Sequence, residues 1–326
     1  MVKREEGQLI AVVGGSGFVG RHTVRALAQR GFRVRAVVRR PDLAGHLQPM
    51  GSVGQIHAVQ GNVRYPDSIA RALEGADGVV NLVGILAKSG AQTFDAIHTA
   101  GARTVAQAAR AVGARHLVHV SALGCGPESA GQYGRTKAAG EAAVIEAFPE
   151  AVILRPSLIF GPEDSLFNRF AAMARVSPVL PLVGGGRTRF QPIYVGDVAT
   201  AIATACEGRA TPGTIYELGG PEVLSFRALL DRVQLHAGRN RRYLPLPYWL
   251  AKFAAAVTAP LPNALRPLTV DQVRMLQSDN VVSAGAAEQG RTIQGLGIAS
   301  PHAIDTIVPG YLESYRVKGQ YSHYRG

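Results

Sequence analysis

The chain has 326 residues, of which 47% are hydrophobic and 18% charged, and this composition excludes a disordered protein. The formal charge of +12 is spread along the chain, with 18 basic and 11 acidic residues in 1–160 and 17 and 12 in 161–326. Nucleic-acid-binding proteins more often carry a clustered basic stripe, so we expect no nucleic-acid partner. A spread positive charge instead suits an anionic cofactor, an acidic protein partner or an anionic membrane surface.

Two cysteines, Cys125 and Cys206, are too few for a disulfide framework and are compatible with a reducing compartment. The first residues lead directly into an apolar segment that ends at Gly14, without the apolar region of a signal peptide. No uninterrupted apolar run reaches 18 residues. We therefore expect neither a signal peptide nor a membrane-spanning helix.

The first half of the chain alternates between short apolar runs, typical of buried parallel strands, and segments of helical periodicity. Such alternation predicts βαβ units, a parallel sheet and right-handed crossovers. The predicted strands cover 8–13, 32–38, 56–59, 78–83, 115–121 and 151–154, and the predicted helices cover 20–30, 68–73 and 93–112.

Beyond Gly161 this rhythm is lost, and proline and glycine become frequent. We therefore predict an α/β protein with a Rossmann-type doubly wound parallel sheet in residues 1–160. A smaller, irregular α/β domain is expected over residues 161–317, from which later segments could return to the first domain. Residues 318–326 are predicted to form a polar tail.

The strongest motif follows the first predicted strand and opens the first helix. It consists of Gly14, Gly17 and Gly20, spaced as G-x-x-G-x-x-G, with Ser16, Phe18 and Val19 between them. In a dinucleotide site such glycines permit a tight turn, let the backbone approach the pyrophosphate and allow close helix–strand packing. Free N–H groups at the helix start then meet the phosphates, so all six residues are predicted to bind a cofactor.

The end of the second strand indicates which cofactor is bound. NAD sites usually place an acidic residue here to bind the ribose 2′-hydroxyl, but this strand ends in Arg39 and Arg40. Two guanidinium groups would attract a 2′-phosphate and form charge-assisted hydrogen bonds with it. The sequence therefore favours NADPH over NADH, although two solvated surface arginines are the alternative.

Two further strand ends belong to the predicted cofactor site. Asn62 and Val63 follow the third strand, at the position that commonly lines the adenine pocket. Val83 and Gly84 end the fourth strand, close to the expected path of the ribose and nicotinamide.

Tyr133 and Lys137 form a Tyr-x-x-x-Lys pair, whose spacing places both side chains on one helix face. An ammonium group beside a phenol favours the phenolate, so Tyr133 could move a proton while hydride moves to or from a nicotinamide. Lys137 would also reach the ribose hydroxyls, and Ser121 at the fifth strand end could bind a substrate carbonyl. These three are the candidate catalytic residues, but the pair could equally serve cofactor binding alone.

The histidines give no indication of a metal site. His116 and His119 are three residues apart on a predicted strand and so point to opposite faces, and the other seven are scattered. We expect no metal ligands.

The glycine motif, the Tyr133/Lys137 pair and Arg155-Pro156-Ser157 together resemble the extended and atypical short-chain dehydrogenase/reductases. A narrower match is similar to one branch of that family, the nucleotide-binding accessory subunits of respiratory complex I (NADH:ubiquinone oxidoreductase). It extends from about residue 9 to 310, and its segments are His46–Gly51, Gly54-Gln55, Phe148–Ala151, Ile159–Asp164 and Gln191–Val198.

This resemblance implies a tightly held, structural NADPH on a subunit of the peripheral arm, docked against other complex I subunits near the quinone-binding region. The location implied is the cytoplasmic, or matrix-equivalent, face of the respiratory membrane. By position, the cofactor contacts would include Gly14, Gly17, Gly20, Arg39, Lys137 and Pro156. Two residues depart from the enzymatic pattern: His98 replaces the usual Asn, and Asn62 replaces the usual Asp.

Residues 239–262 are a candidate membrane-facing segment. Arg239, Arg241 and Arg242 precede an apolar, aromatic stretch that contains Trp249, the only tryptophan. Basic residues beside a short apolar helix suit an interfacial segment at a membrane surface, and four prolines with a lysine exclude a spanning one. The alternative is an ordinary core helix of the smaller domain.

Three hypotheses for function follow. The first is an NADPH-binding accessory subunit of complex I whose cofactor is structural or regulatory. The second is a free NADPH-dependent reductase or epimerase acting on a small carbonyl compound, and the third is a cofactor-sensing regulator. Retention of Tyr133 and Lys137 disfavours the third.

Overall fold

The computed structural model describes residues 7–258 and 268–316, and its chain divides into two compact units. Unit 1 comprises Met1–Pro156, Gly196–Leu218 and Ser283–Ala299, and unit 2 comprises Ser157–Val195, Gly219–Val282 and Ser300–Gly326. Unit 1 thus contains two returns of the chain from the second half. The expected tail at 318–326 lies outside the described residues.

Unit 1 is built on a seven-stranded sheet in the order β11-β6-β5-β4-β1-β2-β3, in which all pairs are parallel. Its central strands are buried on both faces, which explains their near-continuous apolar sequences. The strands are β1 (Leu9–Val13), β2 (Arg33–Val38), β3 (Ile56–Gln60), β4 (Gly78–Asn81), β5 (His116–Val120), β6 (Val152–Pro156) and β11 (Ile215–Leu218). The predicted Rossmann-type fold class is confirmed.

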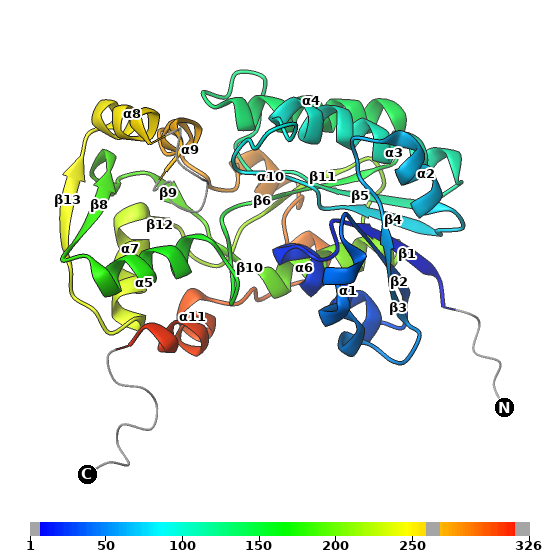
Figure 1. Ribbon diagram of the computed structural model, residues 1–326, viewed down its shortest axis with the longest axis horizontal. Helices are drawn as coiled ribbons and strands as arrows, with labels where there is room; N and C mark the ends of the chain where they lie inside the picture. Colours follow the sequence, from blue (N-terminus) through cyan, green and yellow to red (C-terminus); the bar gives the residue numbers. More distant parts are fainter. Residues whose placement is uncertain (1–6, 259–267, 317–326) are drawn as a thin grey trace, which may run out of the picture. The chain divides into compact units, whose positions relative to one another are not determined.

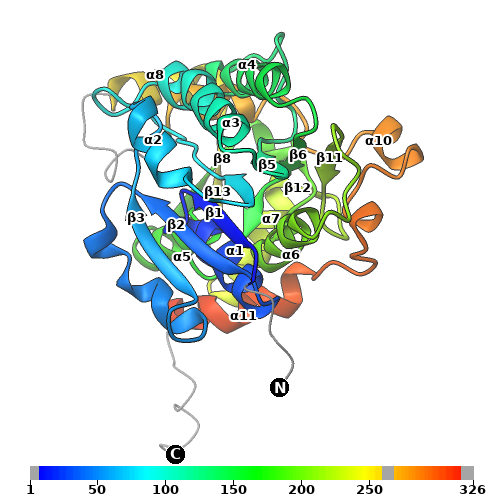
Figure 2. The same cartoon turned by 90° about the vertical axis from the view of Figure 1, so that its right-hand side faces the viewer.

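Helices cover both faces of this sheet (Figure 1 and Figure 2). The helices on one face are α2 (Pro66–Leu73), α3 (Gly101–Ala111) and α4 (Gln132–Ala147), and those on the other are α1 (Phe18–Gln29) and α6 (Val195–Cys206). Small residues such as Ala102, Ala106 and Ala109 lie against the sheet, so α3 approaches it closely. Since the strand order reverses between β1 and β4, the crevice for a ligand is expected at the carboxyl ends of these two strands.

The helix predicted over 93–112 is present over 94–111, but its first turns are π-helical rather than α-helical. Asp95–Ala100 form a π-helical turn, and the regular helix α3 begins only at Gly101. A side-chain carbon at Gly101 would approach the Val63 side chain to 2.9 Å, so this turn packs tightly against the loop after β3. π-Turns of this kind concentrate at functional sites.

The second half of the chain provides strand β11, which the sequence patterns did not indicate. It pairs with β6 in the register Ile215↔Ile153 to Leu218↔Pro156. On its other side the returning segment 283–299 contacts it, as the Glu217 N–H donates to the Arg291 carbonyl oxygen at 2.9 Å. That segment carries α10 (Ala284–Glu288) and a 3-10 turn at Gln294–Leu296.

The described residues of unit 2 (157–195, 219–258, 268–282 and 300–316) form three two-stranded pairings. The pairs are β7 (Ile159–Phe160) with β10 (Ile193–Tyr194), β9 (Arg189–Phe190) with β12 (Leu224–Ser225), and β8 (Val179–Val183) with β13 (Arg242–Leu246). Its helices are α5 (Leu166–Val176), α7 (Phe226–His236), α8 (Tyr248–Val257), α9 (Val270–Met275) and α11 (Ile304–Leu312). Phe160, Phe167 and Phe226 lie in its apolar core.

None of the helices in the described part of the chain is long and apolar enough to cross a bilayer.

Two histidines are buried in unit 1. His98 and His119 are 1% and 2% exposed, and burial lowers the pKa of each to about 3. The positive Lys137 nearby contributes to both shifts. Both imidazoles are therefore neutral in the folded protein at pH values where they carry a proton in the unfolded chain.

These pKa values predict an acid-sensitive fold. The ordinary histidine pKa is 6.5, so the full stability is present above pH 6.5 and is lost as the pH falls toward about 3. Urea unfolding at a series of pH values gives the pH dependence of the free energy of unfolding. This dependence should correspond to about one proton fewer in His119→Gln than in the wild type, because only one buried histidine then remains. His57→Gln, at an exposed position on β3, should leave the pH dependence unchanged. If the free energies of unfolding of the wild type and of His119→Gln changed in parallel between about pH 4 and 6, the low pKa of His119 would be contradicted.

Candidate functional site

The glycine turn between β1 and α1 has the geometry that the motif predicts. Gly14 has φ +90°, a conformation that side chains rarely adopt, and its N–H donates to the Val37 carbonyl oxygen at 2.9 Å. A side-chain carbon at Gly20 would collide with the carbonyl oxygen of Gly14. Helix α1 can therefore start directly against the turn only because both positions lack a side chain.

The start of α1 is open to an anion. Gly17 is its N-cap and is exposed, no side chain caps the helix, and its first turn contains no acidic residue. The N–H groups of Phe18 and Val19 belong to that first turn, where helical N–H groups have no partner within the helix. Together with the helix dipole they form a site of the kind that binds pyrophosphate.

The two arginines after β2 have different environments. Arg40 makes a bidentate contact with Asp42, with Nε–Oδ1 3.0 Å and Nη2–Oδ2 2.7 Å. The hydrogen bond and the charge of Arg40 lower the pKa of Asp42. Arg39 instead donates one hydrogen bond, from Nη1 to Gln92 Oε1 at 2.8 Å. Its remaining N–H groups are the better placed to bind another anion, because a guanidinium carries five donors.

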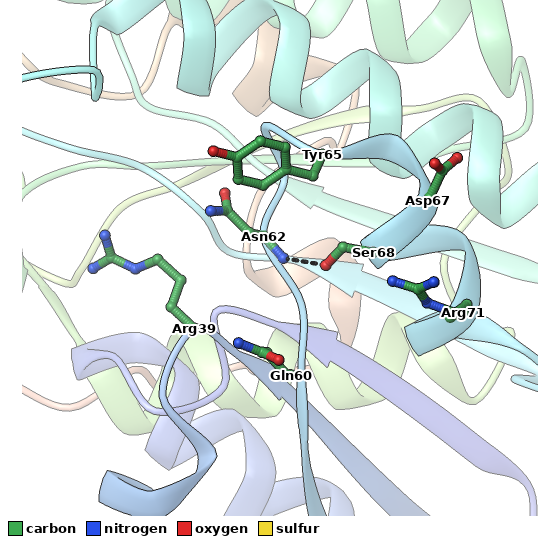
Figure 3. Close-up of a pocket in the computed structure, with 7 residues that line it drawn as sticks. All are labelled: Arg39, Gln60, Asn62, Tyr65, Asp67, Ser68 and Arg71. Atoms are coloured by element: carbon green, nitrogen blue, oxygen red, sulfur yellow. Dashed lines mark hydrogen bonds between the residues drawn. The ribbon is translucent and has the colours of Figure 1, made fainter.

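Arg39 also lines a hollow of about 400 Å³ at the carboxyl ends of β2 and β3 (Figure 3). In the close-up, Arg39 and Arg71 lie on opposite sides of Asn62, and the Tyr65 ring lies above it. The lining residues are Arg39, Gln60, Asn62, Tyr65, Asp67, Ser68 and Arg71. A polar, cationic hollow of this size suits the adenosine end of a nucleotide.

Asn62 is held in a fixed position beside the hollow. Its N–H donates to Ser68 Oγ at 3.0 Å, and its Oδ1 accepts from the Arg64 N–H at 3.1 Å. This Asx-type turn uses the side-chain oxygen, which leaves the amide NH₂ as the group that can face a base. Val63, the next residue, is buried against the core.

The turn after β4 is positioned by a buried chain of hydrogen bonds. Asn81 Oδ1 accepts from the Val83 N–H at 3.2 Å, and its Nδ2 contacts His119 Nδ1 at 3.1 Å. His119 Nδ1 is therefore the acceptor and Nε2 carries the proton. These contacts place Val83 and the exposed Gly84 at the carboxyl edge, where the sequence analysis expected the ribose to pass.

Lys137 points into unit 1 from α4 and is 4% exposed. Its Nζ donates to the Val120 carbonyl oxygen at 3.0 Å, and a carbon added at Gly84 would lie 3.4 Å from Nζ. Burial lowers the pKa of Lys137 to about 8, with the opposing influence of Cys125 and Glu141. An ammonium has three N–H donors, so the group can still bind ribose hydroxyls beside Gly84.

Tyr133 lies in an aromatic cluster with two residues of the π-helical region. Its ring is edge-on to His98 and to Phe94, with ring centres 5.2 and 6.1 Å apart. His98 and Phe94 stack on each other at 5.4 Å. The structure thus brings Tyr133, Lys137 and the unusual His98 together at one edge of the sheet.

Both ring nitrogens of His98 are engaged within the chain. The Ile85 N–H donates to Nε2 at 3.1 Å, so Nδ1 carries the proton and donates to Thr136 Oγ1 at 3.0 Å. Thr136 Oγ1 itself lies within hydrogen-bonding distance of the Gln132 and Tyr133 carbonyl oxygens. A neutral imidazole held in this way has no free ring nitrogen with which to exchange a proton with Tyr133.

Ser121 lies at the end of β5 but is 4% exposed. Its Oγ is 3.5 Å from Cys125 Sγ, which donates to Glu141 Oε1 at 3.0 Å. Glu141 in turn accepts from Arg155 Nε at 2.9 Å. Ser121 is thus the end of a buried polar chain, and the role of its hydroxyl toward a substrate stays a prediction.

Pro156 ends β6 and pairs in register with Leu218. Its carbonyl oxygen accepts from the Leu123 N–H at 2.9 Å, which joins the strand end to the loop after β5.

Several residues of the site escaped the sequence analysis. Gln60, Tyr65, Asp67, Ser68 and Arg71 line the hollow, yet no motif marks them. Asn81 and Gln92 act through hydrogen bonds to residues 38 and 53 positions away, so no local spacing could identify them. Only Ser68 could have been found from local spacing, because it lies six residues after Asn62 and its hydroxyl accepts a hydrogen bond from the Asn62 backbone N–H.

Residues 10–219 match the NAD dependent epimerase/dehydratase family. The chain is 35% identical over 324 residues to the Arabidopsis thaliana "NADH dehydrogenase [ubiquinone] 1 alpha subcomplex subunit 9, mitochondrial". The aligned region covers 96% of this chain and 79% of the plant protein. It is 36% identical over 198 residues to a "Ceramide reductase" of Caulobacter vibrioides, with 61% of each chain covered.

Among solved structures, the Escherichia coli NADPH-dependent quinone oxidoreductase QOR2 complexed with NADPH has the same fold. The TM-score is 0.72 at 19% identity, over 94% of this chain and 99% of that one. The chain therefore belongs to the NAD dependent epimerase/dehydratase family, the extended short-chain dehydrogenase/reductases, and within it to the branch that includes the alpha subcomplex subunit 9 of mitochondrial NADH dehydrogenase.

Proposed function

We propose that the chain is an NADPH-binding accessory subunit of respiratory complex I, whose cofactor has a structural or regulatory role rather than that of an electron donor. The observation that carries this proposal is the 35% identity to a complex I subunit, which extends over 96% of the chain and so includes both units. The partners would be other subunits of the complex near its quinone-binding region.

The nucleotide fits the residues that the structure brings together. The glycine turn leaves the space that a pyrophosphate needs, and the uncapped start of α1 supplies N–H donors. Asn62 and Val63 would face the adenine, Val83 and Gly84 the ribose, and Lys137 the second ribose. NADPH, when bound, supplies a hydride. The residues around its nicotinamide end bear on whether this hydride is transferred.

Arg39 is the main support for NADPH over NADH. It is exposed, lines the hollow and has donors left after its bond to Gln92. Arg40 was predicted to share this role, but its guanidinium is held by Asp42. We propose that Arg39 provides most of the contact with the 2′-phosphate.

The state of His98 supports a cofactor that does not turn over. A reductase needs a supply of protons to the catalytic tyrosine, yet the imidazole beside Tyr133 is neutral and has both nitrogens occupied. Tyr133 and Lys137 would then serve to hold the nicotinamide end of the cofactor. Catalysis by Ser121, Tyr133 and Lys137 belongs to the alternative, a free reductase or epimerase, which the similarity to a ceramide reductase keeps open for test.

Helix α8 provides a surface that suits the membrane. Trp249, Phe253 and Val257 follow one another at helical spacing and are 70%, 64% and 62% exposed. Residues 232–270 contain no acidic residue but several arginines and a lysine. Ala251 and Ala255 are buried, so the helix packs on unit 2 by its small residues and leaves its large ones outside. We propose that α8 lies on an anionic bilayer surface; residues 259–262 of the predicted segment lie outside the described residues.

The cofactor proposal predicts that Arg39→Ala reduces the affinity for NADPH by about tenfold to a hundredfold, the range for a lost charge-assisted hydrogen bond. Affinity for NADH should fall less than affinity for NADPH, since NADH has no 2′-phosphate to lose its contact with Arg39. Titration of NADPH and NADH fluorescence measures both. Arg40→Ala is the matched control and should have a smaller effect; equal losses of NADPH and NADH in Arg39→Ala would refute the assignment.

The assembly proposal predicts that the chain migrates with complex I when solubilised membranes are resolved on native gels. Tyr133→Phe should leave this migration unchanged, because assembly into the complex requires no proton transfer by the phenol. Migration solely as a small soluble species, together with a reductase activity that Tyr133→Phe abolishes, would instead establish the free enzyme.

The surface proposal predicts that the purified chain sediments with vesicles that contain anionic lipid. Trp249→Ser with Phe253→Ser should weaken this binding about tenfold or more, given the transfer free energy of two large apolar side chains. Leu235→Ser, on α7 of the same unit and 65% exposed, is the control and should bind as the wild type does. Undiminished binding of the double variant would exclude α8 as the contact.

A further inference from the structure

The segment between β4 and the π-helical turn has contacts that the glycine turn, the hollow and the Tyr133/Lys137 pair do not explain. Within it, residues 86–92, here called the strap, end in a tight turn. The Ser89 and Gln92 N–H groups donate to each other's carbonyl oxygens at 3.2 and 3.0 Å, and Gly90 has φ +52°. Most of the strap is exposed, including Leu86 at 50%, and Ala87 and Gln92 are half-buried. It therefore owes its position to a few polar contacts rather than to burial.

These contacts fasten the strap on two sides. On one side Arg39 Nη1 donates to Gln92 Oε1 at 2.8 Å. On the other side Lys88 Nζ donates to Gln132 Oε1 at 2.7 Å and lies 5.4 Å from the centre of the Phe94 ring. Gln132 is the first residue of α4, next to Tyr133, and its Nε2 donates to Asp95 Oδ2 at 3.2 Å.

The position of these two anchors in the sheet determines what the strap crosses. Arg39 follows β2, and Gln132 opens the helix that follows β5. Between β2 and β5 lie β1 and β4, the strands at which the order of the sheet reverses. A segment that leaves β4 and is fastened on both sides must pass over the carboxyl ends of these strands, which is the crevice where a dinucleotide binds in this topology.

We infer that the strap closes over the bound dinucleotide, and that Gln92 and Lys88 are positioning residues which keep it closed. This inference rests on the proposed binding of NADPH. Arg39 then has two partners, because its guanidinium can hold Gln92 with Nη1 and the 2′-phosphate with its other donors. The Arg39 guanidinium would thus both select NADPH and fasten the strap over it.

The inference predicts a change in the rate of release. Purified chain loaded with NADPH is mixed with excess NADP⁺, and the loss of NADPH fluorescence is followed. Gln92→Ala should release NADPH about tenfold faster than the wild type, the effect of one lost hydrogen bond to a charged group. The chain offers a matched control, Gln289→Ala, since Gln289 Oε1 also accepts from an arginine, Arg291, at 2.7 Å. It should release NADPH at the wild-type rate.

Hydrogen exchange provides a second readout that does not depend on release. Adding NADPH should slow exchange of the amides in 86–92 in the wild type, and this protection should be reduced in Gln92→Ala and in Lys88→Met. Unchanged release together with no protection of the strap would overturn the inference while leaving NADPH binding intact. A wild-type chain that binds no NADPH would refute the proposed function itself.

Discussion

The site depends on one close approach of backbone to backbone. Helix α1 begins against the end of β1 with no side chain between them, since a carbon at Gly20 would collide with the Gly14 carbonyl oxygen. This approach directs the N–H groups at the start of α1 to the carboxyl edge of the sheet, next to the reversal of strand order at β1 and β4. The residues proposed to contact the nucleotide in unit 1 follow the ends of β1, β2, β3, β4 and β6, and Tyr133 and Lys137 join them from α4.

The hydrogen-bond partners of a side chain in this site indicate its role better than its residue type does. Two consecutive arginines follow β2, but Asp42 holds one and leaves the other to the hollow. A tyrosine and a lysine have the spacing of an active pair, yet the histidine beside them is neutral and fully bonded. The residue types of a dehydrogenase are thus retained beside an imidazole that has no free ring nitrogen. In the same way, Arg39 is proposed both to select the nucleotide and, through its bond to Gln92, to fasten the strap over it.

Sequence patterns predicted the features that depend on local spacing. The glycine turn, the first six strands and the Tyr133/Lys137 pair each have a period or a motif, and the fold class follows from their alternation. Long-range features had no such signal. Strand β11 comes from the second half and joins the sheet beside β6, the π-turn at Asp95–Ala100 interrupts an apparently regular helix, and the bond from Arg39 to Gln92 spans 53 residues. These depend on tertiary packing, which a single sequence does not display.

The composition of unit 1 from three separate segments has a consequence for how the protein is made. Strand β11 is encoded after the first segment of unit 2, and the stretch that lies beside it is encoded after most of unit 2. A ribosome must therefore synthesise about nine-tenths of the chain before the nucleotide fold can be completed, and a gene fragment that stops near residue 160 would leave β6 as an open sheet edge prone to association. Completion of unit 1 is then a late step in the synthesis of the polypeptide.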